Sequence, residues 1–158
     1  MKNKITPFLL FNNEAEEAAK FYVSVFDGKL LGVEKYPDNS PMPAGTVLTA
    51  TFEILGMKMV ALNWGQKSSY LETISFCIEP ETQEEVDKYW KALIADTGSE
   101  GPCSWLKDKY GVSWQVAPEI LNRLMKDPNA KKANAVFQAM MKMKKIIIKD
   151  IQAAYDNA

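Results

Sequence analysis

The residue types that most often carry catalysis are missing from this chain or are badly placed for it. The 158 residues contain no histidine, so neither a Cys–His nucleophile pair nor a Ser–His–Asp triad can be assembled. The carboxylate pairs Glu16-Glu17 and Glu84-Glu85 fall in the first turns of predicted helices, where they suit the helix dipole better than acid–base chemistry. No GxGxxG or Walker sequence occurs. These patterns disfavour a paired-glutamate hydrolase and a Rossmann-type S-adenosylmethionine enzyme.

The composition is that of an ordinary soluble globule. Apolar residues make up 47% of the chain, charged residues 25%, and the net charge is −1, which indicates neither a nucleic-acid partner nor a membrane partner. Cys77 and Cys103 form no CxxC sequence and are too few for a disulfide framework. No apolar run approaches the length of a membrane span or a signal sequence. We therefore expect a cytoplasmic protein with a single domain over residues 1–158.

An internal repeat decides how the chain is organised. Residues 8–22 and 76–90 align without a gap at an offset of 68, which pairs Phe8 with Phe76, Glu16-Glu17 with Glu84-Glu85, Lys20 with Lys88, and Phe21-Tyr22 with Tyr89-Trp90. Self-similarity of this kind indicates a structural unit that occurs twice. Function is then expected where the two units face each other.

The first unit, residues 4–64, is predicted to be βαβββ. Its strands are expected at 4–11, 29–36, 46–54 and 57–63, and its helix at 14–26, capped by Asn12 or Asn13. Pro7 lies inside the first strand, which favours an edge position or a bulge.

The second unit, residues 73–118, repeats this order. A strand at 73–79, a helix at 81–95, one or two short strands within 99–110 and a closing strand at 112–117 are expected. Trp90 belongs to the apolar stripe of the helix and is predicted to be core. Residues 119–158 form a C-terminal extension with helices at 118–126 and 129–143 and a last helix after 146–148. The fold class is therefore α+β, with two βαβββ units that form an eight-stranded curled sheet around a cleft.

Four stretches of the sequence resemble a known family over nearly the whole chain: AEEAAKFYVSVF, VALNWG, ISFCIEPETQEEVDKYW and WLKDKYGVSWQVAPEIL. They are similar to the PhnB-like branch of the glyoxalase/bleomycin-resistance, or vicinal-oxygen-chelate, superfamily. Proteins of this branch often carry the label 3-demethylubiquinone-9 3-methyltransferase. The resemblance implies the curled sheet and its cleft.

The resemblance also implies a divalent metal held by His and Glu side chains from the first and last strands of each unit. Here the strands at 5–10 and 57–62 offer neither imidazole nor carboxylate, and the later strands offer only Cys77 and Gln115. A neutral amide is a poor replacement for a carboxylate ligand. We therefore predict no metal and no other cofactor.

In the family, strands equivalent to those near Trp64, Trp105 and Trp114 line the cavity, which implies that these tryptophans contact a ligand. Asn63 and Gln115 would then supply neutral hydrogen bonds, and Lys107, Asp108 and Tyr110 are weaker candidates. Aromatic walls with a few polar points are typical of small-molecule pockets. An aromatic residue in a strand is also common in a core, so both interpretations stay open.

Three functions remain. The first is a metal-free protein that binds an unidentified small organic ligand in the cleft between its two units. The second is an enzyme, either cofactor-independent with Tyr110, Lys107 or Asp108 as proton carrier, or a methyltransferase as the family label suggests. The third is an interaction protein with a filled cleft that acts through its basic C-terminal helices. The family and the Met-rich, apolar stretch at 140–148 further predict a homodimer.

Overall fold

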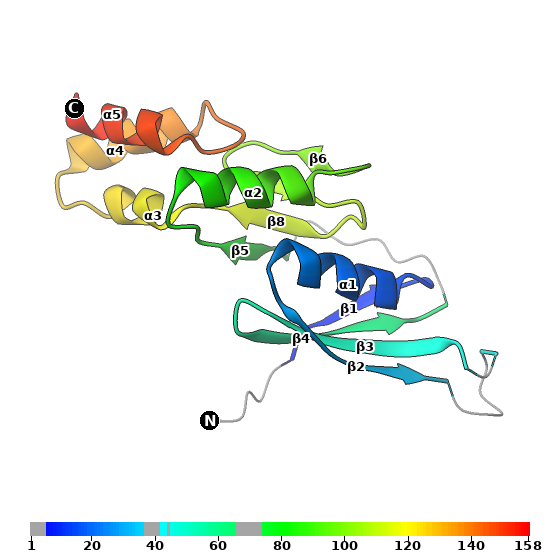
Figure 1. The fold of residues 1–158 in the computed structure, drawn as a ribbon. Coiled ribbons are helices and arrows are strands. Elements are labelled where there is room, and N and C mark those ends of the chain that lie inside the picture. The colour runs from blue at the N-terminus through cyan, green and yellow to red at the C-terminus, as the bar shows by residue number, and fades with distance from the viewer. Residues whose placement is uncertain (1–5, 37–41, 44, 66–73) are drawn as a thin grey trace. The chain divides into compact units, whose positions relative to one another are not determined.

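The computed structural model describes residues 6–36, 42–43, 45–65 and 74–158. These residues form an α+β fold with eight strands and five helices (Figure 1). The strands make two four-stranded sheets, and the chain divides into two compact units, Met1–Ser69 and Tyr70–Ala158, called unit 1 and unit 2 below. The predicted fold class is confirmed.

Unit 1 has the predicted βαβββ order. Its sheet has the strand order β1-β4-β3-β2, with β1 parallel to β4 and the other pairs antiparallel. Pro7 directly precedes the edge strand β1, as its lack of a donor requires, and its carbonyl accepts a hydrogen bond from Val60 N–H at 3.0 Å. The elements are β1 (Phe8–Phe11), α1 (Ala15–Val25), β2 (Lys29–Lys35), β3 (Val47–Ile54) and β4 (Met57–Asn63).

One face of this sheet is covered by α1. Three alanines of α1 are fully buried, so the helix backbone lies close to the sheet, and the rings of Tyr22 and Phe52 stack with centroids 5.8 Å apart. The predicted cap at Asn12 or Asn13 is wrong. Glu14 occupies the N-cap position without a side-chain cap bond, and the Asn63 side-chain oxygen accepts a hydrogen bond from Ala15 N–H at 2.9 Å.

Unit 2 repeats the same topology with shorter strands. Its sheet has the order β5-β8-β7-β6, again with the first pair parallel and the others antiparallel. The helix α2 buries Val86, Trp90 and Leu93, which confirms that Trp90 belongs to the core. The elements are β5 (Phe76–Ile78), α2 (Gln83–Leu93), β6 (Ser99–Glu100), β7 (Trp105–Lys107) and β8 (Ser113–Val116).

The offset of 68 holds for the helices, since α1 begins at Ala15 and α2 at Gln83. It fails for the first strands, and the pairing of Phe8 with Phe76 is wrong. Phe8 is 53% exposed on the face away from α1, whereas the Phe76 ring lies 5.3 Å from the ring of buried Trp114.

The cause is the length of one connection. Three residues separate β1 from α1, and four separate β5 from α2. Phe11 and Ile78, both buried, are the last paired residues of their strands and are therefore equivalent at an offset of 67. A one-residue shift moves every strand side chain to the other face.

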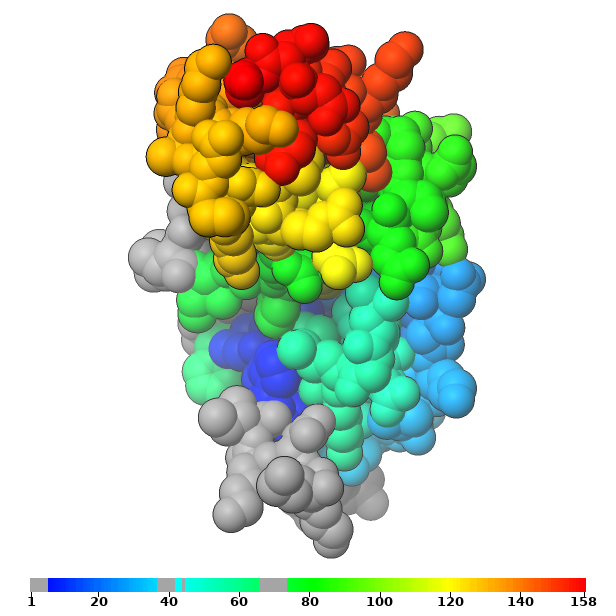
Figure 2. Space-filling view, turned by 90° about the vertical axis from the view of Figure 1, so that its left-hand side faces the viewer, coloured from blue at the N-terminus to red at the C-terminus, as the bar shows by residue number. Residues whose placement is uncertain are grey.

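The C-terminal extension consists of α3 (Glu119–Met125), α4 (Ala130–Met140) and α5 (Ile148–Asp156). The three helices pack around a buried apolar cluster that includes Leu121, Val136 and Ile151. Figure 2 shows them as a continuous patch of yellow, orange and red surface next to the green surface of α2.

Residues 143–148, called the strap below, follow α4 in the chain and end at the first residue of α5. Their hydrogen bonds join the C-terminal extension to α2. The Gln83 side chain donates to Ile146 O at 3.2 Å and accepts from Ile148 N at 2.8 Å. Lys145 Nζ lies 2.6 Å from an Asp87 carboxylate oxygen, and this hydrogen bond lowers the pKa of Asp87. The strap is thus bonded directly to α2.

Candidate functional site

The two faces of the unit 2 sheet have different compositions. The face toward α2 carries Phe76, Leu106 and Trp114, which lie side by side by strand register. The opposite face, called the open face below, carries two rows of register partners: Ser99, Lys107 and Ser113 in one row, and Cys77, Gln115 and Trp105 in the other. Polar and aromatic groups therefore alternate with the core residues along each strand.

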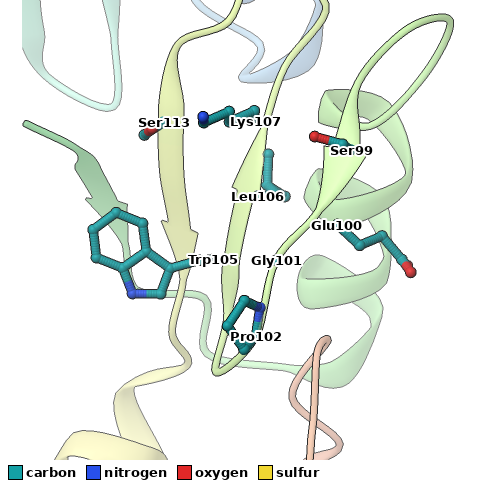
Figure 3. A pocket seen from close by; sticks show the side chains of 8 residues that line it. All are labelled: Ser99, Glu100, Gly101, Pro102, Trp105, Leu106, Lys107 and Ser113. Carbon is teal, nitrogen blue, oxygen red and sulfur yellow. The ribbon is translucent and has the colours of Figure 1, made fainter. Parts of the chain in front are cut away.

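A pocket of about 460 Å³ lies along β6, β7 and β8 of the unit 2 sheet, and its lining includes Trp105, Lys107 and Ser113 of the open face. Its lining comes from β6, β7, β8 and the connection between β6 and β7 (Figure 3): Ser99, Glu100, Gly101, Pro102, Trp105, Leu106, Lys107 and Ser113. Figure 3 shows the side chains of Trp105 and Lys107 on the side of β7 that faces Ser113, and Glu100 directed away from them. The volume of the pocket falls within the usual range for small-molecule sites.

The turn that closes this pocket has an unusual backbone. Cys103 and Ser104 have φ values of 53° and 74°, in the left-handed region that side chains disfavour. Cys103 N–H donates to Met143 O and Ser104 N–H to Lys144 O, each at 2.8 Å, so the strap holds the turn. At Gly101 a Cβ would lie 3.0 Å from Trp105 O, which makes glycine the best fit there.

The structure places the predicted site residue Trp114 in the core. Its side chain is 1% exposed and its indole N–H donates to Asp108 Oδ2 at 2.9 Å. The other oxygen of the buried Asp108 accepts from the backbone N–H groups of Tyr110 and Val112 at 2.9 and 3.0 Å. Asp108 thus ties the β7–β8 turn to the core tryptophan.

Asn63 and Trp64 belong to unit 1. Asn63 is buried, and its side chain donates to Val47 O at 3.0 Å as well as capping α1, so its amide supports the fold. Trp64 follows β4 and its side chain is 57% exposed. A contact between Trp64 and a ligand stays a prediction.

The remaining candidates lie on or near the open face. Trp105 and Lys107 line the pocket, and Gln115, the register partner of Trp105, donates to Ser75 Oγ at 2.8 Å. Tyr110 lies in the turn before β8, with Lys109 Nζ 5.3 Å from its ring centroid. Sequence reasoning missed Ser99 and Ser113, which become visible only when strand register shows that they flank Lys107.

The Cys77 thiol is a poor nucleophile in this position. Burial raises the pKa of Cys77, and the nearby Glu79 carboxylate raises it further. The neutral thiol therefore predominates at neutral pH, and covalent chemistry through Cys77 is disfavoured.

The open face does not fit the metal that the superfamily implies. Cys77 and Gln115 are register partners there, one a protonated thiol and the other a neutral amide. Across the part of the chain that the structure describes, no group of three His, Cys, Asp or Glu residues could hold a metal ion. No chemical step is therefore assigned to a metal.

Three solved structures show which known proteins have a similar fold. The PhnB protein from Bacillus cereus, named for a 3-demethylubiquinone-9 3-methyltransferase, is 35% identical with a TM-score of 0.65, over 73% of this chain and 99% of its own. A protein from Pseudomonas aeruginosa is 22% identical with a TM-score of 0.59, over 73% of this chain and 96% of its own. The fosfomycin resistance protein FosX from Mesorhizobium loti is 12% identical with a TM-score of 0.55, over 80% and 99%. These are proteins with the glyoxalase-type fold.

The 3-demethylubiquinone-9 3-methyltransferase family matches residues 3–117, so the chain belongs to this family, within the PhnB-like branch of the glyoxalase/bleomycin-resistance superfamily. The match ends before α3, and the C-terminal extension lies outside it. No curated protein matches the chain. Within the described residues, no helix is both long and apolar enough to cross a membrane.

Proposed function

We propose that the chain is a metal-free protein that binds a small organic ligand without covalent chemistry, and that the ligand lies against the open face of unit 2. The observation that carries this proposal is the pocket of about 460 Å³ with Trp105 in its wall. An indole with neighbouring hydroxyl and amide groups is the usual equipment of a small-molecule site. The protonated state of Cys77 favours binding over nucleophilic catalysis.

The test is ligand retention by the full chain. Native mass spectrometry of the purified protein, mixed with a metabolite extract, should show an adduct of a few hundred daltons that Trp105→Ala removes. Trp64→Ala is the matched control, because Trp64 is exposed in unit 1 and outside this pocket. If Trp64→Ala removes the adduct and Trp105→Ala does not, the ligand contacts are in unit 1 and the proposed location is wrong.

Two measurements test the other functions: the same mass spectra and a metal analysis. Retention of S-adenosylmethionine would favour methyl transfer, as the family's name suggests. Metal analysis that finds one equivalent of zinc, nickel, iron or manganese, lost on Gln115→Ala or Cys77→Ala, would contradict the metal-free proposal.

We also propose a homodimer in the cytoplasm. Sedimentation at micromolar concentration should show the dimer mass, and a species of 17.8 kDa alone would contradict it.

A further inference from the structure

We propose that α5 forms the contact surface of the homodimer and packs antiparallel against α5 of a second copy, around a two-fold axis between Gln152 and Ala153. This inference rests on the homodimer that we propose as part of the function, and it assigns the contact to the C-terminal extension, outside the residues that the family matches. It follows from a groove beside α5 and from the order of the charges along this helix.

The groove has a volume of about 570 Å³ and is lined mainly by apolar groups of α3, the strap and α5. The fold absorbs part of the apolar stretch at 140–148, because Ile146 is fully buried and Met140 and Met143 pack against the cluster inside the extension. The isoleucines that line the groove are instead partly exposed: Ile120, Ile147 and Ile148. Apolar side chains gathered in this way favour a contact with a partner.

The residues of α5 in this groove form a stripe whose charges are arranged symmetrically. Lys149 and Asp156 are exposed at its two ends, and Gln152 and Ala153 lie between them. Positions 149 and 156 have the same midpoint as positions 152 and 153. In an antiparallel pair about this midpoint, Lys149 therefore meets Asp156 of the second copy at both ends, and the small Ala153 lies at the centre, where it allows close approach. A parallel pair would bring like charges together.

The helix dipole provides a second argument for an antiparallel partner. Lys149 lies in the first turn of α5 and Asp156 is its last residue, so each charge lies at the end of its own helix that disfavours it. Beside an antiparallel helix, each charge lies next to the opposite end of the partner's dipole and is stabilised there. Asp150, whose charge suits the first turn of its own helix, lies outside the groove lining. The charges that suit a partner helix are thus those in the groove.

The ion pairs set the orientation of the two helices more than they hold them together. α5 has nine residues and is about 13.5 Å long. Exposed ion pairs contribute little stability, so the isoleucines of the groove supply most of the buried surface. A contact of this length predicts a dimer that dissociates on dilution.

The experiment measures the dissociation constant of the dimer by sedimentation velocity over a dilution series of the full chain. Lys149→Glu and Asp156→Lys should each raise the dissociation constant by about tenfold or more, because each places like charges at both ends of the stripe. The double variant should bind more tightly than either single variant, because it restores opposite charges. It should bind more weakly than the parent, because the exchanged charges no longer suit the partner's dipole.

Two further variants complete the set. Ala153→Trp, at an exposed position on the proposed axis, should abolish the dimer by keeping the two helices apart. Lys142→Glu, a charge reversal at an exposed position outside the groove, is the control and should leave the dissociation constant unchanged. Both charge reversals in α5 suit its own dipole, so circular dichroism should show that those variants stay folded.

The outcomes separate the inference from the proposals on which it rests. A dimer that survives Ala153→Trp and both charge reversals would place the interface elsewhere, which overturns the inference and leaves the homodimer supported. A double variant no tighter than the single variants would show that Lys149 and Asp156 do not face each other, which overturns the antiparallel pairing. A parent chain that is monomeric at every concentration would overturn the homodimer and the inference together. Ligand retention by the pocket at Trp105 is measured separately and tests the binding function in each case.

Discussion

The strands of unit 1 contain four, seven, eight and seven residues, whereas those of unit 2 contain three, two, three and four. Both sheets nevertheless have the same strand order and pairing directions. Short strands make fewer ladder hydrogen bonds, and unit 2 has further bonds from buried side chains and the strap. A repeated topology therefore does not require repeated sources of stability.

Two tryptophans should show most strongly that the two units are stabilised differently. Trp64 follows β4, the last strand of unit 1, and Trp114 lies in β8, the last strand of unit 2. Trp114 fills the core of unit 2 and holds Asp108, whereas Trp64 is 57% exposed after β4. We expect Trp114→Ala to lower the free energy of unfolding by about 3–5 kcal/mol, as for other buried tryptophans. Trp64→Ala should change it by less than about 0.5 kcal/mol.

Urea denaturation followed by circular dichroism measures both changes. Trp114→Phe is the intermediate variant, since it keeps much of the ring volume but removes the indole donor to Asp108. A loss for Trp114→Ala as small as that for Trp64→Ala would show that the unit 2 sheet does not depend on this side chain.

The N-terminal caps of α1 and α2 should show the next largest difference in their contribution to stability. Asn63 caps α1 from a distant strand in a buried position, whereas Thr82 caps α2 locally by accepting from Glu85 N–H at 3.2 Å. Asn63→Ala leaves buried backbone groups without their partner and should cost about 1–3 kcal/mol. Thr82→Ala should cost about 1 kcal/mol. Thermal or urea denaturation measures both variants. Equal losses in the free energy of unfolding would mean that the buried position of the Asn63 cap does not increase its contribution to stability.

Much of this architecture follows from the sequence, because local signals specify it. The helix predicted at 14–26 corresponds to α1, where Ala15, Ala18, Ala19 and Tyr22 recur at helical spacing and are buried. The break predicted between the helices at 118–126 and 129–143 falls between α3 and α4, at Asp127-Pro128. The β1–α1 and β5–α2 connections differ by one residue, and a gapless alignment hides this difference. The face occupied by each strand side chain was therefore not predictable from the repeat alone.

The candidate site was harder to predict than the fold for the same reason. Trp105 and Trp114 lie on opposite faces of the sheet, and only the register of three strands separates them. Asn63 looks like an exposed strand end in the sequence, yet it bonds to Ala15, 48 positions earlier. Neither the register nor this contact leaves a pattern in the sequence.

The strap offers a smaller and more local test of how unit 2 is stabilised. Gln83→Ala removes the side-chain bonds to Ile146 O and Ile148 N and a third bond to the Asp87 carboxylate at 3.0 Å, whereas its counterpart in unit 1 is Ala15. We expect the free energy of unfolding to fall by about 1 kcal/mol, because the two bonds to the strap join neutral groups and the bond to Asp87 is exposed to water. Hydrogen exchange should be faster at the Ile148 amide while the amides of β3 keep their protection. Unchanged exchange at Ile148 would show that the strap is held by other contacts.

The smallest effect should be the pH dependence of the bond between Trp90 and Glu100. The hydrogen bond from the Trp90 indole, followed by that from Lys144, lowers the pKa of Glu100 in the folded protein. A group whose pKa is lowered on folding stabilises the protein above its unfolded pKa, and this contribution is lost as the pH falls through the folded value. Glu100→Gln should therefore be slightly less stable than the parent chain near pH 7, and the difference should shrink below the usual glutamate range of about 4.3. Urea denaturation of both proteins across this range measures the difference, and Glu81→Gln is the control on an exposed glutamate. A difference that stays constant with pH would contradict this prediction, because it would show that the ionisation of Glu100 does not cause the difference in stability.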